Sequence, residues 1–155
     1  MATEIERKFL VINDSWRDAV ESHVRVLQGY LSNGPNATVR VRVKGEAAFL
    51  TIKGRMQGIS RSEYEYEIPL ADAESMLRDL SVSSAIDKTR YHVRCGDHLW
   101  ELDLFRGANA GLVMAEVELS SEDEAFEMPA WAGQEVSEDL RYYNVNLATN
   151  PYTSW

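Results

Sequence analysis

Residues 38–44 read Thr-Val-Arg-Val-Arg-Val-Lys, and from residue 39 onward valine alternates with a basic side chain. Successive side chains of a β-strand point to opposite faces, and β-branched residues favour the extended backbone. Arg40, Arg42 and Lys44 therefore share one face, and the valines between them share the other. The stretch predicts a strand with one ionic face and one aliphatic face.

The same period of two recurs along most of the 155-residue chain. The predicted strands cover residues 4–11, 24–31, 38–44, 48–53, 61–68, 86–94, 99–105 and 112–119. Short helices are predicted at 13–21, 71–80, 122–126 and 137–148. Because short turns with glycine, asparagine or proline separate several strands, the sequence predicts one mainly β (α+β) domain over residues 1–155, either an antiparallel barrel or a strongly curved sheet.

Charges of one sign follow one another on several of the predicted strand faces. Glu63 and Glu65 share a face, as do Glu116 and Glu118. An ordinary half-buried sheet with one solvated face explains any single strand of this kind. Like charges along and across a sheet repel, however, so repeated runs indicate that a ligand supplies counter-charge. Rows of cations suit a polyanion, and paired carboxylates suit a hard divalent metal ion.

A closed sheet of this composition has two arrangements. With the aliphatic face inward, the barrel interior is an ordinary core. With the ionic face inward, the interior is a polar tunnel, and helices such as those predicted at 71–80 and 137–148 cover the outer face. The alternation alone leaves this choice open.

The overall charge limits the kinds of partner that we expect. The formal net charge is −9, which argues against a protein that coats nucleic acid. Clustered cations can still bind an anionic substrate, since exposed charges are screened within about 8 Å at physiological salt. The charged first residues are not typical of a secretory signal, no apolar run suits a membrane span, and Cys95 is the only cysteine. These features favour a cytoplasmic protein, and a homodimer is one assembly compatible with them.

An ordered set of motifs resembles the CYTH superfamily, also called the triphosphate tunnel metalloenzymes. It opens with Glu4-Ile5-Glu6-Arg7-Lys8, which matches the Glu-x-Glu-x-Lys signature. The matching segments that follow are 28–31 (Gln-Gly-Tyr-Leu), 40–42 (Arg-Val-Arg), 51–54 (Thr-Ile-Lys-Gly), 60–65 (Ser-Arg-Ser-Glu-Tyr-Glu), 88–91 (Lys-Thr-Arg-Tyr), 101–103 (Glu-Leu-Asp), 116–118 (Glu-Val-Glu) and 139–142 (Asp-Leu-Arg-Tyr). The chain is most similar to short, single-domain bacterial members that hydrolyse inorganic triphosphate.

The resemblance implies an eight-stranded antiparallel closed barrel with its charged face inward, flanked by short helices and plugged at one mouth by a C-terminal helix at 137–148. It implies that basic residues hold the triphosphate, namely Lys8, Arg40, Arg42, Lys53, Lys88 and Arg90. It also implies Mg²⁺ or Mn²⁺ bound by carboxylates, namely Glu4, Glu6, Glu63, Glu65, Asp103, Glu116 and Glu118. Lys8 and Tyr30 match the catalytic positions of the short triphosphatases.

The reaction that the resemblance implies is metal-dependent hydrolysis of tripolyphosphate to pyrophosphate and phosphate. Lys8 either pairs with a neighbouring glutamate or transfers a proton from water, and the second role needs a lowered pKa. The alternatives are a thiamine- or nucleoside-triphosphatase, a class IV adenylate cyclase, or a non-catalytic polyphosphate-binding module. Close relatives often carry lysine where this chain has Leu140, so a substrate contact of that lysine would be lost here.

Overall fold

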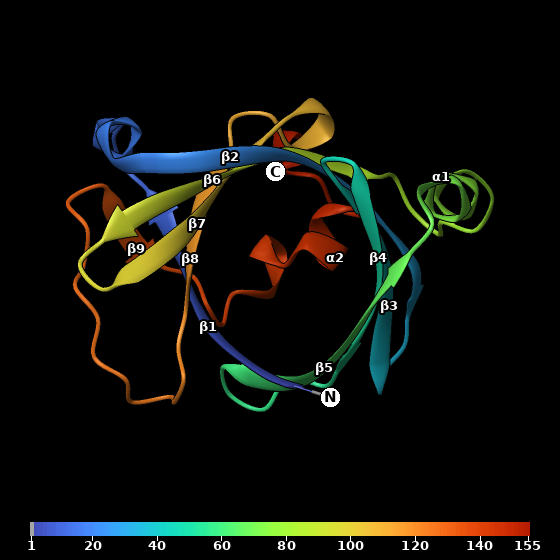
Figure 1. The fold of residues 1–155 in the computed structure, drawn as a ribbon, viewed down its shortest axis with the longest axis horizontal. Coiled ribbons are helices and arrows are strands. Elements are labelled where there is room, and N and C mark those ends of the chain that lie inside the picture. Colours follow the sequence, from blue (N-terminus) through green and yellow to red (C-terminus); the bar gives the residue numbers. More distant parts are fainter. Residues whose placement is uncertain (1) are drawn as a thin grey trace.

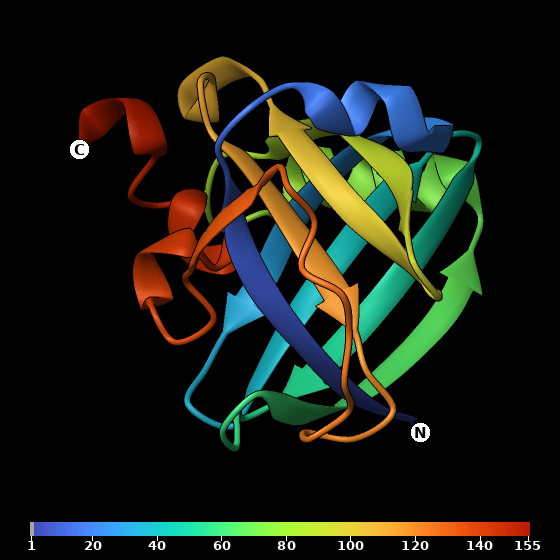
Figure 2. The ribbon, with the colours of Figure 1, turned by 90° about the vertical axis from the view of Figure 1, so that its left-hand side faces the viewer.

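A computed structural model describes residues 2–155 of the chain (Figures 1 and 2). Within that range the strands are β1 (Ala2–Val11), β2 (Val20–Asn33), β3 (Ala37–Lys44), β4 (Ala47–Gly54), β5 (Ser60–Ile68), β6 (Ile86–Cys95), β7 (His98–Phe105), β8 (Val113–Glu118) and β9 (Ala132–Glu135). The α-helices in it are α1 (Leu70–Asp79) and α2 (Asn144–Leu147). The 3₁₀-helices are Ser15–Ala19, Gly107–Asn109, Leu140–Tyr142 and Tyr152–Ser154. Neither α-helix of the described chain has the length and hydropathy of a membrane span.

The strands close into a barrel through β1. The sheet order is β5-β4-β3-β2-β6-β7-β8-β1, every pairing is antiparallel, and β1 also pairs with β5. Residues 2–5 of β1 pair with β5, and residues 9–11 pair with β9 after β5 has left that edge. Figure 1 looks down this barrel and shows α2 inside its outline. The predicted eight-stranded antiparallel barrel is confirmed, and β9 is an addition to it.

The aliphatic face of the strands points outward. Val41, on the strand that alternates most regularly, is completely buried and belongs to a cluster with Ala48 and with Ala73 of α1. The helix therefore covers the outer face of β2, β3 and β4, at the side of the barrel in Figure 1. Since opposite faces alternate along β3, the arginines on either side of Val41 point into the barrel. The charged face is inward, as predicted.

A second outer cluster covers β1, β6, β7 and β8. Trp100 is completely buried there, and its ring contacts the rings of Phe9, Phe126 and Trp131. Trp16 of the first 3₁₀-helix packs on Tyr91 in the same region. Residues 119–131, between β8 and β9, therefore cover this face of the barrel, and we call this segment the strap.

Gly29 of β2 lies close to Leu77 of α1 and to Ser81, which follows the helix. A Cβ at this position would lie 2.7 Å from Leu77 Cδ2 and 2.8 Å from Ser81 Oγ. We expect Gly29→Ala to lower the free energy of unfolding by about 1–3 kcal/mol, the usual cost of overpacking. Gly34→Ala is the control, because its Cβ would meet only Ala37 O at 3.6 Å. Equal unfolding midpoints for the two variants would contradict this packing.

Two of the predicted helices are wrong in kind or extent. The helix expected at 13–21 is a 3₁₀-helix that ends at Ala19, because Val20 already pairs with Val93 of β6. In place of the helix expected at 122–126, residues 121–124 form a single turn within the strap and 125–126 have no regular secondary structure. The Glu124 side chain is held by Ser120 and His98, and Phe126 is drawn onto the outer cluster. Tertiary contacts outweigh local helix propensity at both places.

The C-terminal helix expected at 137–148 is also broken. Leu140–Tyr142 and α2 are separated by Tyr143, which is extended (φ −70°, ψ 134°). This conformation places the Tyr143 ring over Lys8 and lets its hydroxyl donate to Ser137 O at 2.9 Å. Leu147 and Ala148 pack against Tyr30, Ile86 and other apolar residues within one end of the barrel. The segment thus fills that end of the barrel, as predicted, although most of it is not helical.

Candidate active site

The barrel encloses a polar cavity of about 260 Å³. Its lining is almost entirely ionic. The basic lining residues are Lys8, Arg40, Arg42, Lys44, Lys53, Arg61, Lys88 and Arg90. The acidic ones are Glu4, Glu6, Glu63, Glu65, Glu101, Glu116 and Glu118. The remaining lining residues are Tyr30, Thr38, Tyr143, Asn144 and Val145.

The strand order separates most of these charges into two halves of the wall. The neighbouring strands β4, β3, β2 and β6 contribute basic or neutral polar side chains, whereas β7, β8 and β1 contribute mainly carboxylates. β5 supplies Glu63, Glu65 and Arg61 where the two halves meet. A polyanion can therefore lie against one half while the carboxylates face it from the other.

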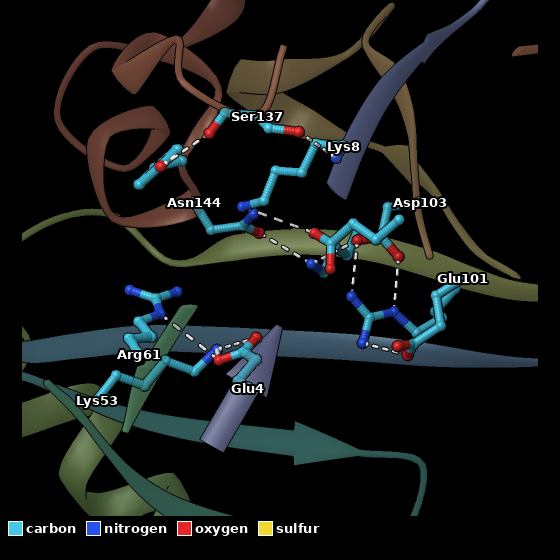
Figure 3. Close-up of polar contacts among 12 residues, drawn as sticks. Glu4, Lys8, Lys53, Arg61, Glu101, Asp103, Ser137 and Asn144 are labelled. Carbon is cyan, nitrogen blue, oxygen red and sulfur yellow. Dashed lines mark hydrogen bonds and ion pairs between the residues drawn. The ribbon is translucent and has the colours of Figure 1, made fainter. Parts of the chain in front are cut away.

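The most buried ionic contacts in the wall join Asp103 to Lys88 and to Arg90. Arg90 Nε and Nη2 donate to the two Asp103 oxygens at 2.8 and 2.9 Å, and Nη1 donates to Glu101 Oε2 at 2.7 Å. Lys88 Nζ donates to Asp103 Oδ2 at 2.7 Å (Figure 3). Burial would lower the pKa of Arg90, but Asp103 and Glu101 outweigh it and hold that pKa well above its usual value. Lys88 has the opposite balance: burial, with the charges of Arg90 and Arg42, lowers its pKa to about 7 despite Asp103.

Arg40 is buried and Arg42 is half-buried, and neither has a full set of partners among the described residues. Arg40 Nε has no hydrogen-bond partner among the described residues, and its guanidinium reaches Thr51 Oγ1 at 3.3 Å and Glu65 at 3.7 Å. Arg42 Nε donates to Gln28 Oε1 at 2.8 Å, and within residues 2–155 no carboxylate pairs with it. Burial, followed by the charges of Arg40 and Arg90, lowers the pKa of Arg42 to about 9. This part of the wall carries positive charge that the protein leaves uncompensated.

Glu4, Glu6 and Glu116 crowd together on the opposite half. Burial raises the pKa of Glu6 well above its usual value, and the charges of Glu116 and Glu4 raise it further. Burial would also raise the pKa of Glu4, but Lys53 and Arg61 lower it; the two cations lie 2.9 and 3.5 Å from its Oε2 (Figure 3). In residues 2–155 no three acidic, histidine or cysteine side chains converge as a preformed metal centre. The donor set nevertheless fits a hard divalent cation, because it consists of carboxylate oxygens whose mutual repulsion such an ion would relieve.

Lys8 and Tyr30 lie at the end of the cavity that the C-terminal segment fills. Lys8 Nζ is 3.8 Å from Glu116 Oε1 and 4.5 Å from the centre of the Tyr143 ring. Burial alone would lower the pKa of Lys8, but Glu116 and Glu6 outweigh it, so the pKa is raised. The contact with Glu116 fits the ion-pair role of Lys8, and its role in proton transfer stays a prediction.

Comparison with known proteins agrees with this geometry. An inorganic triphosphatase from Acetivibrio thermocellus is 44% identical over 155 residues, which cover 100% of this chain and 99% of that protein. An inorganic triphosphatase from Nitrosomonas europaea is 42% identical over 150 residues, 94% of this chain and 97% of its own. A family model described as the CYTH domain matches residues 2–152. The chain belongs to the CYTH family.

A solved structure supports the same assignment for the CYTH barrel. The crystal structure of an inorganic triphosphatase matches it with a TM-score of 0.69 and 40% sequence identity, covering 96% of this chain and 95% of that one. The family predicted from the ordered motifs is confirmed.

The CYTH cavity brings together nearly all the residues singled out in the sequence. The basic residues Lys8, Arg40, Arg42, Lys53, Lys88 and Arg90 line it, as do Tyr30 and the carboxylates Glu4, Glu6, Glu63, Glu65, Glu116 and Glu118. Asp103 is the exception: it does not line the cavity, and both of its oxygens are occupied by Arg90 and Lys88. In the structure Asp103 is a buried partner of two basic residues, and its expected role as a metal ligand stays a prediction. Leu140 is 62% exposed and lies outside the lining, so it takes no part in the site.

Several residues of the site were missed in the sequence. Arg61, Glu101, Tyr143 and Asn144 line the cavity, and Gln28 is completely buried behind Arg42. Arg61 and Glu101 each lie two residues before an acidic residue that the sequence had singled out, Glu63 and Asp103, so the strand period of two could have found them. Tyr143 and Asn144 reach the cavity only because the C-terminal segment enters the barrel, which no local pattern indicates.

Proposed function

We propose that the protein holds inorganic triphosphate inside the barrel and hydrolyses it to pyrophosphate and phosphate. The observation that carries this proposal is Arg42, which is half-buried in the cavity wall and has no carboxylate partner among the described residues. A guanidinium without a carboxylate partner is costly to bury, and a phosphate group relieves that cost with charge-assisted hydrogen bonds. The relatives of matching length are named inorganic triphosphatases, which supports this substrate over other polyanions.

The basic half of the wall would bind the triphosphate. Arginines grip phosphate oxygens with planar pairs of N–H donors, whereas lysines act as point charges. Arg40, Arg42 and Lys88 present donors to the cavity, and Arg90 is held in place by Asp103. Because these groups are already positioned and shielded from bulk water, they stabilise the charge of the reacting phosphate more than exposed groups would. Asp103 belongs to this machinery as the counter-charge that fixes Arg90 and Lys88.

The acidic half would hold a divalent cation. Glu4, Glu6 and Glu116 are the central candidates, and Glu63, Glu65 and Glu118 extend the set. We propose Mg²⁺ or Mn²⁺, because carboxylate and phosphate oxygens are the ligands that these ions prefer. When bound, such an ion neutralises phosphate charge and lowers the pKa of water. Lys8 would keep the carboxylates and substrate in place by its charge, and the Tyr30 hydroxyl would donate a hydrogen bond to a phosphate oxygen.

The test is a comparison of substrates with the purified protein. Tripolyphosphate, ATP and thiamine triphosphate are each incubated with Mg²⁺ or Mn²⁺, and released phosphate is measured. We expect tripolyphosphate to be hydrolysed fastest and chelation with EDTA to stop the reaction. Faster turnover of ATP or thiamine triphosphate would identify an organic triphosphatase, and a cyclic nucleotide product would identify a cyclase. Binding of tripolyphosphate without any turnover would identify a binding module, and each of these outcomes contradicts the proposal.

Replacement of Arg40 tests the substrate role of the basic wall. We expect Arg40→Gln to weaken tripolyphosphate binding about 10- to 100-fold, the range for losing a hydrogen bond to a charged group. The unfolding midpoint should change little, because Arg40 makes one long hydrogen bond and one loose ion pair within the protein. KM and the melting temperature are the two measurements. Arg55→Gln, on the exposed β4–β5 turn, is the control and should change neither. A large loss of stability with unchanged KM would make Arg40 structural.

A further inference from the structure

Gln28 of β2 is a neutral side chain between two basic strands. It is completely buried, although it carries an amide that must be hydrogen-bonded there. Its Oε1 accepts from Arg42 Nε at 2.8 Å, and its Nε2 donates to Tyr30 Oη at 3.0 Å and to Asn144 Oδ1 at 3.2 Å. One amide therefore contacts the substrate-facing arginine, the tyrosine and the C-terminal segment.

The orientation of this amide follows from its neighbours. An arginine has only donors, so the Gln28 atom beside Arg42 Nε must be the oxygen. The amide nitrogen then faces Tyr30 and Asn144. The same argument fixes Asn144, because Lys88 Nζ is also a pure donor and lies 2.9 Å from Asn144 Oδ1. Figure 3 labels Asn144 and Asp103, and the Lys88 ammonium donates a hydrogen bond to each of them.

Each of these bonds leaves a functional group pointing in a defined direction. Arg42 uses Nε for Gln28, which leaves its Nη–H groups for other acceptors. Tyr30 accepts from Gln28, so its own hydroxyl proton stays free to donate into the cavity that Tyr30 lines. Lys88 gives N–H groups to Asp103 and Asn144, which directs its remaining donor away from both.

We propose that Gln28 is a positioning residue, which fixes the donor directions of Arg42 and Tyr30 directly and that of Lys88 through Asn144. The role does not require contact between Gln28 and substrate, since Gln28 is absent from the cavity lining. This role also makes the C-terminal segment part of the substrate-binding wall, because Asn144 Oδ1 accepts hydrogen bonds from both Gln28 and Lys88. The inference rests on the proposed hydrolysis of triphosphate, and it adds a residue that keeps the substrate-binding groups correctly oriented.

The experiment is a double-mutant cycle with Gln28→Met and Tyr30→Phe, measured as kcat and KM on tripolyphosphate. Methionine keeps the length of the side chain and removes all three hydrogen bonds. We expect Gln28→Met to lower kcat/KM about 10- to 100-fold, the range for outer residues that orient functional groups. Tyr30→Phe should then cause a much smaller loss in the Gln28→Met background than in the wild type. Gln28→Met combined with Lys53→Met is the matched control, whose fold-losses should multiply because Lys53 bonds to Glu4 instead of this network. Fold-losses that also multiply for Gln28 and Tyr30 would overturn the proposal.

Asn144→Ala gives a second test that leaves the barrel strands intact, in case Gln28→Met folds poorly. The double variant Asn144→Ala, Lys88→Met should lose less kcat/KM than the product of the two single-variant fold-losses. A double variant whose loss equals that product would overturn the link between Gln28 and Lys88 through Asn144. Calorimetry measures whether the wild-type protein binds tripolyphosphate in the absence of metal, and the phosphate assay measures whether it hydrolyses it. Together these two measurements distinguish a failure of this inference from a failure of the proposed function. A wild-type protein that neither binds nor hydrolyses tripolyphosphate overturns both. A wild-type protein that does both, matched by an equally active Gln28→Met, overturns the positioning role alone.

Discussion

Arg90→Met is expected to lower the free energy of unfolding by about 3–5 kcal/mol, because it removes one of the two cations that pair with the buried Asp103. Asp103 is 2% exposed and receives both of its Arg90 hydrogen bonds inside the wall. Glu101 loses its bond to the same guanidinium. Thermal or denaturant unfolding of the metal-free protein measures the effect, and hydrolysis of tripolyphosphate should be lost with it.

The control for Arg90 lies on the same strand. Arg94 pairs with Glu21 at 2.9 Å, but its side chain is 46% exposed. Exposed ion pairs contribute little, so Arg94→Met should leave the unfolding midpoint close to that of the wild type. Similar losses for Arg90→Met and Arg94→Met would show that the buried network is not what stabilises this side of the barrel.

Glu6→Gln is expected to separate stability from activity. The raised pKa of Glu6 means that its ionised form is disfavoured in the folded protein. A group whose folded pKa is raised destabilises the fold at pH values above its unfolded pKa, and an amide removes this cost at neutral pH. The metal-free variant should therefore melt at a higher temperature than the wild type. Its rate of triphosphate hydrolysis should fall roughly 10²- to 10³-fold, because the amide lacks the charge that holds a divalent ion.

Addition of Mg²⁺ gives a second measurement for Glu6. The melting temperature of the wild type should rise with metal, and that of Glu6→Gln should rise much less. Glu67→Gln is the matched control, since Glu67 continues the β5 row of glutamates but lies outside the cavity lining. A Glu6→Gln variant that is both less stable and fully active would contradict the carboxylate cluster.

The strand alternation predicted most of the barrel because it is a local property of the chain. The alternation of Val41 with Arg40 and Arg42 shows that this strand has an aliphatic and an ionic face, whatever its position in the fold. The alternation could not decide which face is inside, since that depends on what covers the other one. In the structure α1 and the strap cover the aliphatic face, and neither contact leaves a signal within the strands themselves.

The parts of the site that the sequence did not predict depend on register and on distant contacts. Asp103 was placed on the correct face, but its pairing with Arg90 follows from the β6–β7 register. Gln28 carries no charge, so it belongs to none of the same-sign runs that indicated a ligand-binding face. The apolar spacing of residues 140–147 suggested one helix, whereas Tyr143 becomes extended to contact Lys8 and Ser137.

If the ionic faces enclose a site for triphosphate, a crystal structure with bound tripolyphosphate will show phosphate oxygens inside the barrel, within hydrogen-bond distance of the Arg42 Nη groups. We expect the tripolyphosphate to lie between β3 and the carboxylates of β1 and β8. Tripolyphosphate bound only on the outer surface, with the Arg42 guanidinium unchanged in an unliganded cavity, would contradict it.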